Sequence, residues 1–249
     1  HRDLHSFPTR RSSDLECHYS ALARRLGRKG LPILYHPYAY NPKTLTCDTA
    51  LLPAVQRAKG NKRMLLYMGT LAKNYGILDL LKGVKALSLR RNDFVFHVFG
   101  RGRHAVEASQ LAAEMSLQGV VQFDGYVAEA SLGTWFSCAD VFLAPVFDTI
   151  QDKARCPSKV YMYLPFEKPI VTCKIGDPYD LLASDGFYFR PGDIDGLAEV
   201  MSRALDKAGE WKPASLKFAE HTWDNRTRQF LDWIDVPYCE KRRGETHEF

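Results

Sequence analysis

From residue 62 onward, short apolar runs alternate with longer segments in which apolar residues recur every three or four positions. The runs of strand length cover residues 64–68, 94–99, 120–123, 141–144, 170–173 and 187–189. The helical pattern covers residues 77–89, 105–117, 132–138, 157–165 and 194–208. Because the runs are largely apolar and do not alternate strictly with polar residues, the strands are expected to be buried on both faces. The pattern therefore predicts an α/β fold, a parallel sheet with helices on both faces.

In such a sheet a ligand binds in the crevice beyond the carboxyl ends of the strands, so the loops after the strands are the candidate site. The first loop begins at Gly69-Thr70 and contains Lys73. The second is Gly100-Arg101-Gly102-Arg103, and the third contains Gly125-Tyr126. Backbone amides and guanidinium groups in such loops suit an anion.

The segment 156–171 predicts a loop, a short helix and a buried strand. Pro157 suits the first helical position, and Ser158 and Lys159 complete a turn whose free N–H groups suit phosphate. Lys159, Met162 and Tyr163 recur at helical spacing, so they share a face that we expect to open on the anion site. A plain crossover helix with a solvated lysine is the alternative, and spacing alone does not choose between them. Pro165 should end or kink this helix early.

Pro157-Ser158-Lys159, then Tyr163 and Lys168-Pro169-Ile170-Val171, together resemble a signature of group 1 (family 4) glycosyltransferases. The resemblance implies the C-terminal, Rossmann-like donor-binding half of the two-domain GT-B fold, with Lys159 as the catalytic residue that neutralises the donor diphosphate. It implies the following donor-binding residues: Gly69, Thr70, Lys73, Gly100, Arg101, Gly102, Gly125, Tyr126, Pro157, Ser158, Met162 and Tyr163. The implied function is transfer of a sugar, with retention of configuration, from a nucleotide-sugar donor to a glycan, lipid or polysaccharide acceptor.

The chain departs from the family pattern at several positions. Thr70 and Tyr75 stand where many members carry Arg and Lys, and Ala154 and Met162 stand where the family often carries two Glu residues. The second of those Glu residues binds the ribose hydroxyls, and a methionine cannot accept such a hydrogen bond usefully. Glu167 replaces a glycine. A degenerate, non-catalytic member is therefore an alternative, as is a nucleotide-sugar epimerase of the same architecture.

Other polar residues have less specific interpretations. Gly100 to Ala105, with Asp124 further on, matches a dinucleotide-binding fingerprint, but it belongs to the second strand–helix unit and not the first. His97 and Asp140 are expected to be structural. The polar loop 146–156 is expected to contact the transferred sugar; its charged residues are Asp148, Asp152, Lys153 and Arg155.

Composition narrows the class of partner. The formal net charge of +5 is compatible with anionic ligands or peripheral association with a membrane, but it is too small to indicate nucleic-acid binding. Six cysteines without a C-x-x-C pair favour a reducing, cytoplasmic location, including the inner face of a membrane. No apolar run reaches the roughly 18 residues of a membrane span. The spacing of histidines and acids predicts no metal site, and no cofactor is expected beyond the donor substrate.

The chain divides into five expected parts. Residues 1–15 look like a translated sequencing adapter, with the gene fragment beginning near Glu16. Residues 16–60 are expected to hold a helix (16–30), a strand (33–35) and a proline-rich linker, the end of an acceptor-binding domain. Residues 61–215 form the nucleotide-sugar-binding domain. Residues 216–236 form a crossover helix, and 237–249 a tail.

Overall fold

The computed structural model describes residues 34, 36–214 and 217–235. The predicted helix at 16–30, the adapter-like segment and the tail after residue 237 lie outside these ranges, as does most of the strand expected at 33–35.

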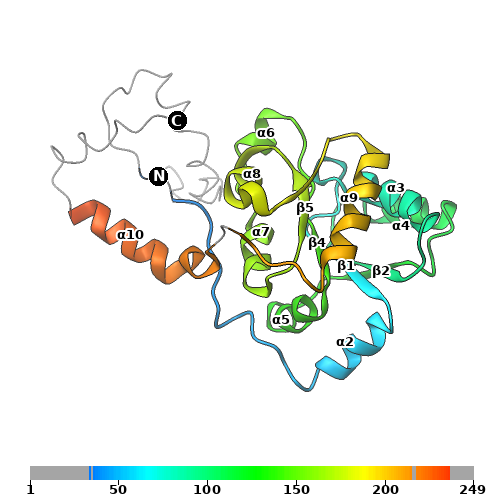
Figure 1. Ribbon diagram of the computed structural model, residues 1–249, viewed down its shortest axis with the longest axis horizontal. Helices are drawn as coiled ribbons and strands as arrows, with labels where there is room; N and C mark the ends of the chain where they lie inside the picture. Colours follow the sequence, from blue (N-terminus) through cyan, green and yellow to red (C-terminus); the bar gives the residue numbers. More distant parts are fainter. Residues whose placement is uncertain (1–33, 35, 215–216, 236–249) are drawn as a thin grey trace, which may run out of the picture.

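The described chain folds around a parallel sheet with the strand order β3-β2-β1-β4-β5-β6 (Figure 1). The strands are β1 (Arg63–Met68), β2 (Phe94–Phe99), β3 (Val121–Gly125), β4 (Val141–Leu143), β5 (Ile170–Cys173) and β6 (Phe187–Phe189). The predicted fold class is confirmed. The order reverses between β1 and β4, and in doubly wound sheets the ligand crevice lies at that point.

Helices cover both faces of the sheet (Figure 1). The α-helices are α2 (Leu52–Lys59), α3 (Ile77–Ser88), α4 (Ala105–Glu114), α5 (Glu129–Cys138), α6 (Ile150–Lys153), α7 (Ser158–Tyr163), α8 (Gly176–Leu182), α9 (Ile194–Lys207) and α10 (Trp223–Asp235). Short 3-10 turns are η1 (Lys73–Tyr75), η2 (Leu164–Phe166), η3 (Ala183–Asp185) and η4 (Phe218–His221). One core contains α3, α4 and α9, and the other contains residues of α5, α7 and α8.

Alternate residues of β1 enter different cores, which is why its run is continuously apolar. Leu65 and Tyr67 join the core under α3 and α9, whereas Met64 and Leu66 join the core under α5 and α7. Since successive strand side chains point to opposite faces, both faces of β1 are buried.

Pro165 ends α7 early, as expected from the sequence. The α-helix stops at Tyr163 and continues as the 3-10 turn η2, which contains the proline. Glu167 follows with φ 51° in the left-handed region. A glycine would adopt this conformation without the strain that a side chain brings, so Glu167 is a locally unfavourable choice.

The helix α2 was not predicted, because Pro53 was assigned to the linker. The proline occupies the first turn of α2, where its missing N–H costs no intrahelical bond. Residues 36–51 before it form no regular element apart from a bridge between Tyr40 and Thr222. Tyr40 N–H donates to the His221 carbonyl (3.0 Å), and Trp223 N–H donates to the Tyr40 carbonyl (3.2 Å). This stretch of the linker is therefore attached to the start of α10.

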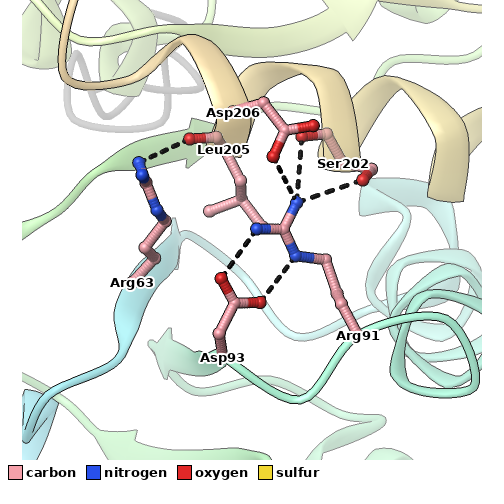
Figure 2. A network of polar contacts seen from close by, with 6 residues as sticks. All are labelled: Arg63, Arg91, Asp93, Ser202, Leu205 and Asp206. Atoms are coloured by element: carbon pink, nitrogen blue, oxygen red, sulfur yellow. Dashed lines mark hydrogen bonds and ion pairs between the residues drawn. The ribbon is translucent and has the colours of Figure 1, made fainter.

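An arginine network closes the end of the sheet opposite the predicted site (Figure 2). Arg91 donates from Nε and one Nη to the two carboxylate oxygens of Asp93, at 2.7 and 2.8 Å. Its other Nη donates to Asp206 (2.8 Å) and Ser202 of α9. The network joins the start of β2 to α9, because one planar guanidinium can serve several acceptors at once.

Candidate donor-binding site

The glycine loops after β1, β2 and β3 are joined through their backbones. Gly69 N–H donates to the Phe99 carbonyl (2.9 Å), and Leu71 N–H donates to the Arg101 carbonyl (2.9 Å). Gly100 N–H in turn donates to the Gly125 carbonyl at 2.7 Å. The sequence placed these loops at one edge of the sheet, and the structure makes them a single hydrogen-bonded layer.

At two positions in these loops, Gly69 and Gly100, the packing of the protein itself leaves little room for a side chain. Gly100 has φ 136°, and a Cβ there would collide with the Gly69 carbonyl oxygen. A Cβ on Gly69 would lie 2.7 Å from Lys159 Nζ and 3.1 Å from the Tyr67 hydroxyl. The first loop therefore approaches the second loop too closely for a side chain at Gly100, and a side chain at Gly69 would displace the end of Lys159.

Lys159 brings a positive charge from α7 to the first glycine loop. Its Nζ lies 4.2 Å from the centroid of the Tyr67 ring, a cation–π contact. Burial, and then the neighbouring Arg155 guanidinium, lower the pKa of Lys159 from its ordinary 10.5 to about 7. Since α7 has only six residues, the positive charge that this helix brings to the loop comes mainly from the lysine side chain and less from the helix dipole.

The hydroxyl group of Tyr67, a residue of β1, holds the backbone of the first glycine loop. Its side chain is fully buried, and its hydroxyl lies 3.1 Å from the Thr70 carbonyl and 3.3 Å from the Tyr75 carbonyl. Burial raises the pKa of Tyr67 well above its usual value, so the hydroxyl stays a neutral donor. The tyrosine thereby positions the backbone of the loop that faces Lys159.

The loop between β4 and α7 is organised by Asp152. This carboxylate is buried, accepts a hydrogen bond from Phe147 N–H (2.7 Å) and forms an ion pair with Arg155 (2.9 Å). Arg155 also stacks on the Tyr75 ring, with Cζ 4.4 Å from the centroid. Of the loop residues expected to contact sugar, Asp152 is thus occupied within the protein, while Asp148 and Lys153 pair with each other at the surface.

The remaining predicted residues of the three loops lie toward the rim. Arg101 lies over the Tyr126 ring, 5.4 Å from its centroid, and Tyr126 is 67% exposed. Lys73 pairs with Glu107 at 3.0 Å on the surface. Gly102 packs under the Leu71 carbonyl. Tyr126 is therefore accessible from solvent, whereas Lys73 already has a partner.

The predicted residues around α7 lie at different depths. Tyr163 is fully buried, stacks on Phe142 (4.1 Å, 6°) and accepts a hydrogen bond from Met68 N–H at 3.0 Å. Tyr163 therefore lies in the core and supports the site indirectly, because its hydroxyl group holds the end of β1. Met162 packs partly buried against the same core. Pro157 is the buried N-cap residue, and Ser158 is half-buried in the first turn.

His97 and Asp140 are structural, as expected. His97 is 1% exposed, and its Nδ1 lies 2.9 Å from Asp124. Asp140 accepts a hydrogen bond from Met64 N–H (2.6 Å) and pairs with Lys59 of α2. Asp124, the acid of the dinucleotide fingerprint, is thus already engaged by His97.

Within the described ranges, no group of three or more His, Cys, Asp or Glu residues has the arrangement of a metal site. No helix in these ranges is both long and apolar enough to cross a bilayer.

Sequence comparison defines the class of protein. The family profile of the Glycosyl transferases group 1 matches residues 62–207, which is more than half of the chain, so the chain belongs to this family. The matched residues contain the sheet through β6, the three glycine loops, α7 and α9. No curated protein matches the chain in sequence.

Solved structures with the same fold are distant in sequence. Sucrose-phosphate synthase from Thermosynechococcus elongatus superimposes with a TM-score of 0.69 at 18% identity, covering 87% of this chain and 55% of that one. Anabaena HepE in complex with UDP and glucose gives 0.59 at 13% identity, covering 79% and 55%. The C-terminal domain of a Francisella tularensis group 1 glycosyl transferase gives 0.55 at 11% identity, covering 80% and 100%. The fold is that of GT-B glycosyltransferases, and the chain spans about half the length of the first two.

Sequence reasoning did not identify two important members of the site. Tyr67 lies inside an apolar strand, where nothing distinguishes it from a core residue. Arg155 was noted as one polar residue of a loop, and its stacking on Tyr75 depends on two segments about 80 positions apart. Tyr75 itself could have been a signal, because it replaces a lysine of the family pattern.

Proposed function

We propose that this chain is the donor-binding half of a retaining, metal-independent glycosyltransferase. It would transfer a sugar from a nucleotide-sugar donor to a glycan, lipid or polysaccharide acceptor. The observation that carries the proposal is the approach of the Lys159 ammonium group to Gly69 at the carboxyl end of β1. Two further points support it, membership of the family and the position of this contact beside the point where the strand order reverses.

The chemistry follows from where charge develops. When the bond between the anomeric carbon and the donor diphosphate breaks, negative charge accumulates on the diphosphate oxygens. Lys159 would stabilise that charge more in the transition state than in the bound donor, which accelerates the reaction. The joined glycine loops would offer backbone N–H groups to the same oxygens, and the rigid layer would need little reorganisation.

A non-catalytic, nucleotide-binding role is the second candidate, and the observation that favours it is Met162. This residue packs against the core at the position where the family often has a ribose-binding Glu. In that case the site would bind a nucleoside diphosphate weakly. The epimerase alternative would need acid and base groups from another domain.

We further propose that the protein acts in the cytoplasm or at the inner face of a membrane, in the synthesis of an envelope polysaccharide. In the part of the chain that the structure describes, Cys47, Cys138 and Cys173 form no disulfide, which supports a reducing compartment.

Calorimetric titration of the protein with UDP, GDP, ADP and NAD tests the proposal, with Lys159→Ala as the comparison and Lys82→Ala, an exposed lysine of α3, as the control. We expect one nucleoside diphosphate to bind and the Lys159 substitution alone to weaken it. Weak binding that Lys159→Ala leaves unchanged would favour the non-catalytic candidate. Binding of NAD alone would refute the glycosyltransferase assignment.

A further inference from the structure

Arg155 leaves most of its hydrogen-bonding capacity unused inside the candidate site. Its Nη2 forms an ion pair with Asp152 Oδ1 (2.9 Å), and the face of its guanidinium group lies on Tyr75. Its Nε and Nη1 atoms are buried and have no hydrogen-bond partner. A buried donor without a partner is costly, and a charged donor more so. These two nitrogen atoms therefore indicate an acceptor that arrives with a ligand.

The charges around Arg155 identify the chemistry of that ligand. Arg155 and Lys159 interact closely enough for the arginine to lower the pKa of the lysine. Asp152 is the carboxylate that opposes both cations, and its second oxygen already accepts from Phe147 N–H. Two cationic side chains against one carboxylate leave an unbalanced positive charge beside Gly69, where the Arg155 Nε and Nη1 atoms are buried. An anion with several oxygen atoms would restore the balance.

The surroundings of Arg155 hold its guanidinium group in place. Tyr75 covers one face of the group and Asp152 fixes one edge, so the remaining edge keeps a defined direction. By contrast, Lys73 pairs with Glu107 at the surface, and Arg101 lies over the exposed Tyr126. An arginine fixed in this way is suited to phosphate, because less conformational freedom is lost on binding.

We propose that Arg155 is a second cationic ligand of the donor diphosphate, acting beside Lys159 through its free Nε–H and Nη1–H groups. Asp152 and Tyr75 are positioning residues for it. This inference rests on the proposed function, since it assigns a further binding residue to the same site. It also explains how the site holds a diphosphate although the first loop carries Thr70 and Tyr75 in place of basic residues.

The test compares Arg155→Gln and Arg155→Lys with wild type, and uses Arg57→Gln as the matched control. Arg57 is an exposed arginine of α2. Calorimetry measures three ligands: inorganic pyrophosphate, the nucleoside diphosphate among UDP, GDP and ADP that wild type binds most tightly, and its parent nucleoside. We expect Arg155→Gln to weaken the two diphosphate ligands about 10- to 100-fold and to leave the nucleoside unchanged. Arg155→Lys, which keeps the charge, should show a smaller loss, and Arg57→Gln none.

The outcomes separate the inference from the proposed function. If wild type binds a nucleoside diphosphate and Arg155→Gln binds it equally well, Arg155 is not a ligand although the proposed function stands. An equal loss for nucleoside and diphosphate would mean that the substitution acts on the fold, which also overturns the inference. If wild type binds no nucleoside diphosphate, both fail. If Arg155→Gln does not fold, Arg155→Lys decides: it keeps a partner for Asp152, and unchanged affinity for pyrophosphate would overturn the inference.

Discussion

Replacing Lys159 with methionine should stabilise the protein, and the gain should depend on pH. The substitution keeps a long apolar side chain against Tyr67 and removes the amine. In the folded protein the pKa of Lys159 lies at about 7, lowered first by burial and then by Arg155, whereas 10.5 is its ordinary value. Between these two pH values the unfolded chain binds more protons than the folded one, so wild-type stability rises with pH. Below about pH 7 the lysine is charged in both states, and the cost of burying its charge is fully present.

The size of the effect follows from the same two values. Each pKa unit corresponds to about 1.36 kcal/mol, so the full difference is about 5 kcal/mol. About 3 kcal/mol of it should disappear between pH 6.5 and pH 9.5, because the folded amine is neutral over most of that range. Arg155 and Asp152 are present in both proteins, so effects of these two residues on the rest of the fold cancel in the comparison.

Urea unfolding of wild type and Lys159→Met at pH values from 6.5 to 9.5 measures this difference. Lys82→Met, at an exposed position of α3, should differ from wild type by a constant amount. We expect the excess stability of Lys159→Met to shrink steadily as the pH rises. A pH-independent difference between Lys159→Met and wild type would show that the amine is not desolvated, and the electrostatic account of the site would be wrong.

Three further substitutions test the structure around the site. Gly100→Ala should destabilise the protein by several kcal/mol, because its Cβ would collide with the Gly69 carbonyl oxygen at φ 136°; thermal unfolding measures this, and a loss below about 1 kcal/mol would contradict the loop packing. Tyr163→Phe should cost about 1–3 kcal/mol in urea unfolding, because the partly buried Met68 N–H loses its acceptor; no loss would mean that water replaces the hydroxyl. Arg91→Lys should cost about 1–2 kcal/mol, because an ammonium group cannot serve Asp93 and α9 together; equal stability would show that the network in Figure 2 contributes little.

The strands that are buried on both faces were the easiest to predict from the sequence, whereas the edge strands β3 and β6 are only partly buried. β2 is fully buried along its length, and five of its six residues are apolar, with His97 as the exception. Helix ends and short helices were harder to predict, since α6 has four residues and depends on the Thr149 side chain as its N-cap. From the sequence, Pro53 can be interpreted either as part of a linker or as part of the first turn of a helix. Only the packing of α2 decides between these interpretations.

The parts of the site that consist of local sequence motifs could be predicted. The glycine loops follow the strands directly, and the sequence therefore placed them at one edge of the sheet. The contacts of Lys159 with Tyr67, and of Arg155 with Tyr75, join segments about 80 to 90 positions apart. No local pattern encodes such pairs, because they depend on how α7 and its preceding loop pack over the first loop.

The central claim is that Lys159 neutralises the donor diphosphate, and proton uptake on binding tests it most directly. At pH 8 a terminal phosphate group, with a second pKa of about 6, is already ionised, whereas Lys159 with its pKa of about 7 is mostly neutral. The measurement is calorimetric titration with the bound nucleoside diphosphate at pH 8, in two buffers of different ionisation enthalpy. We expect uptake of nearly one proton per ligand by wild type and none by Lys159→Met. Binding to wild type without proton uptake would contradict the claim, because the lysine would then not become charged against the diphosphate.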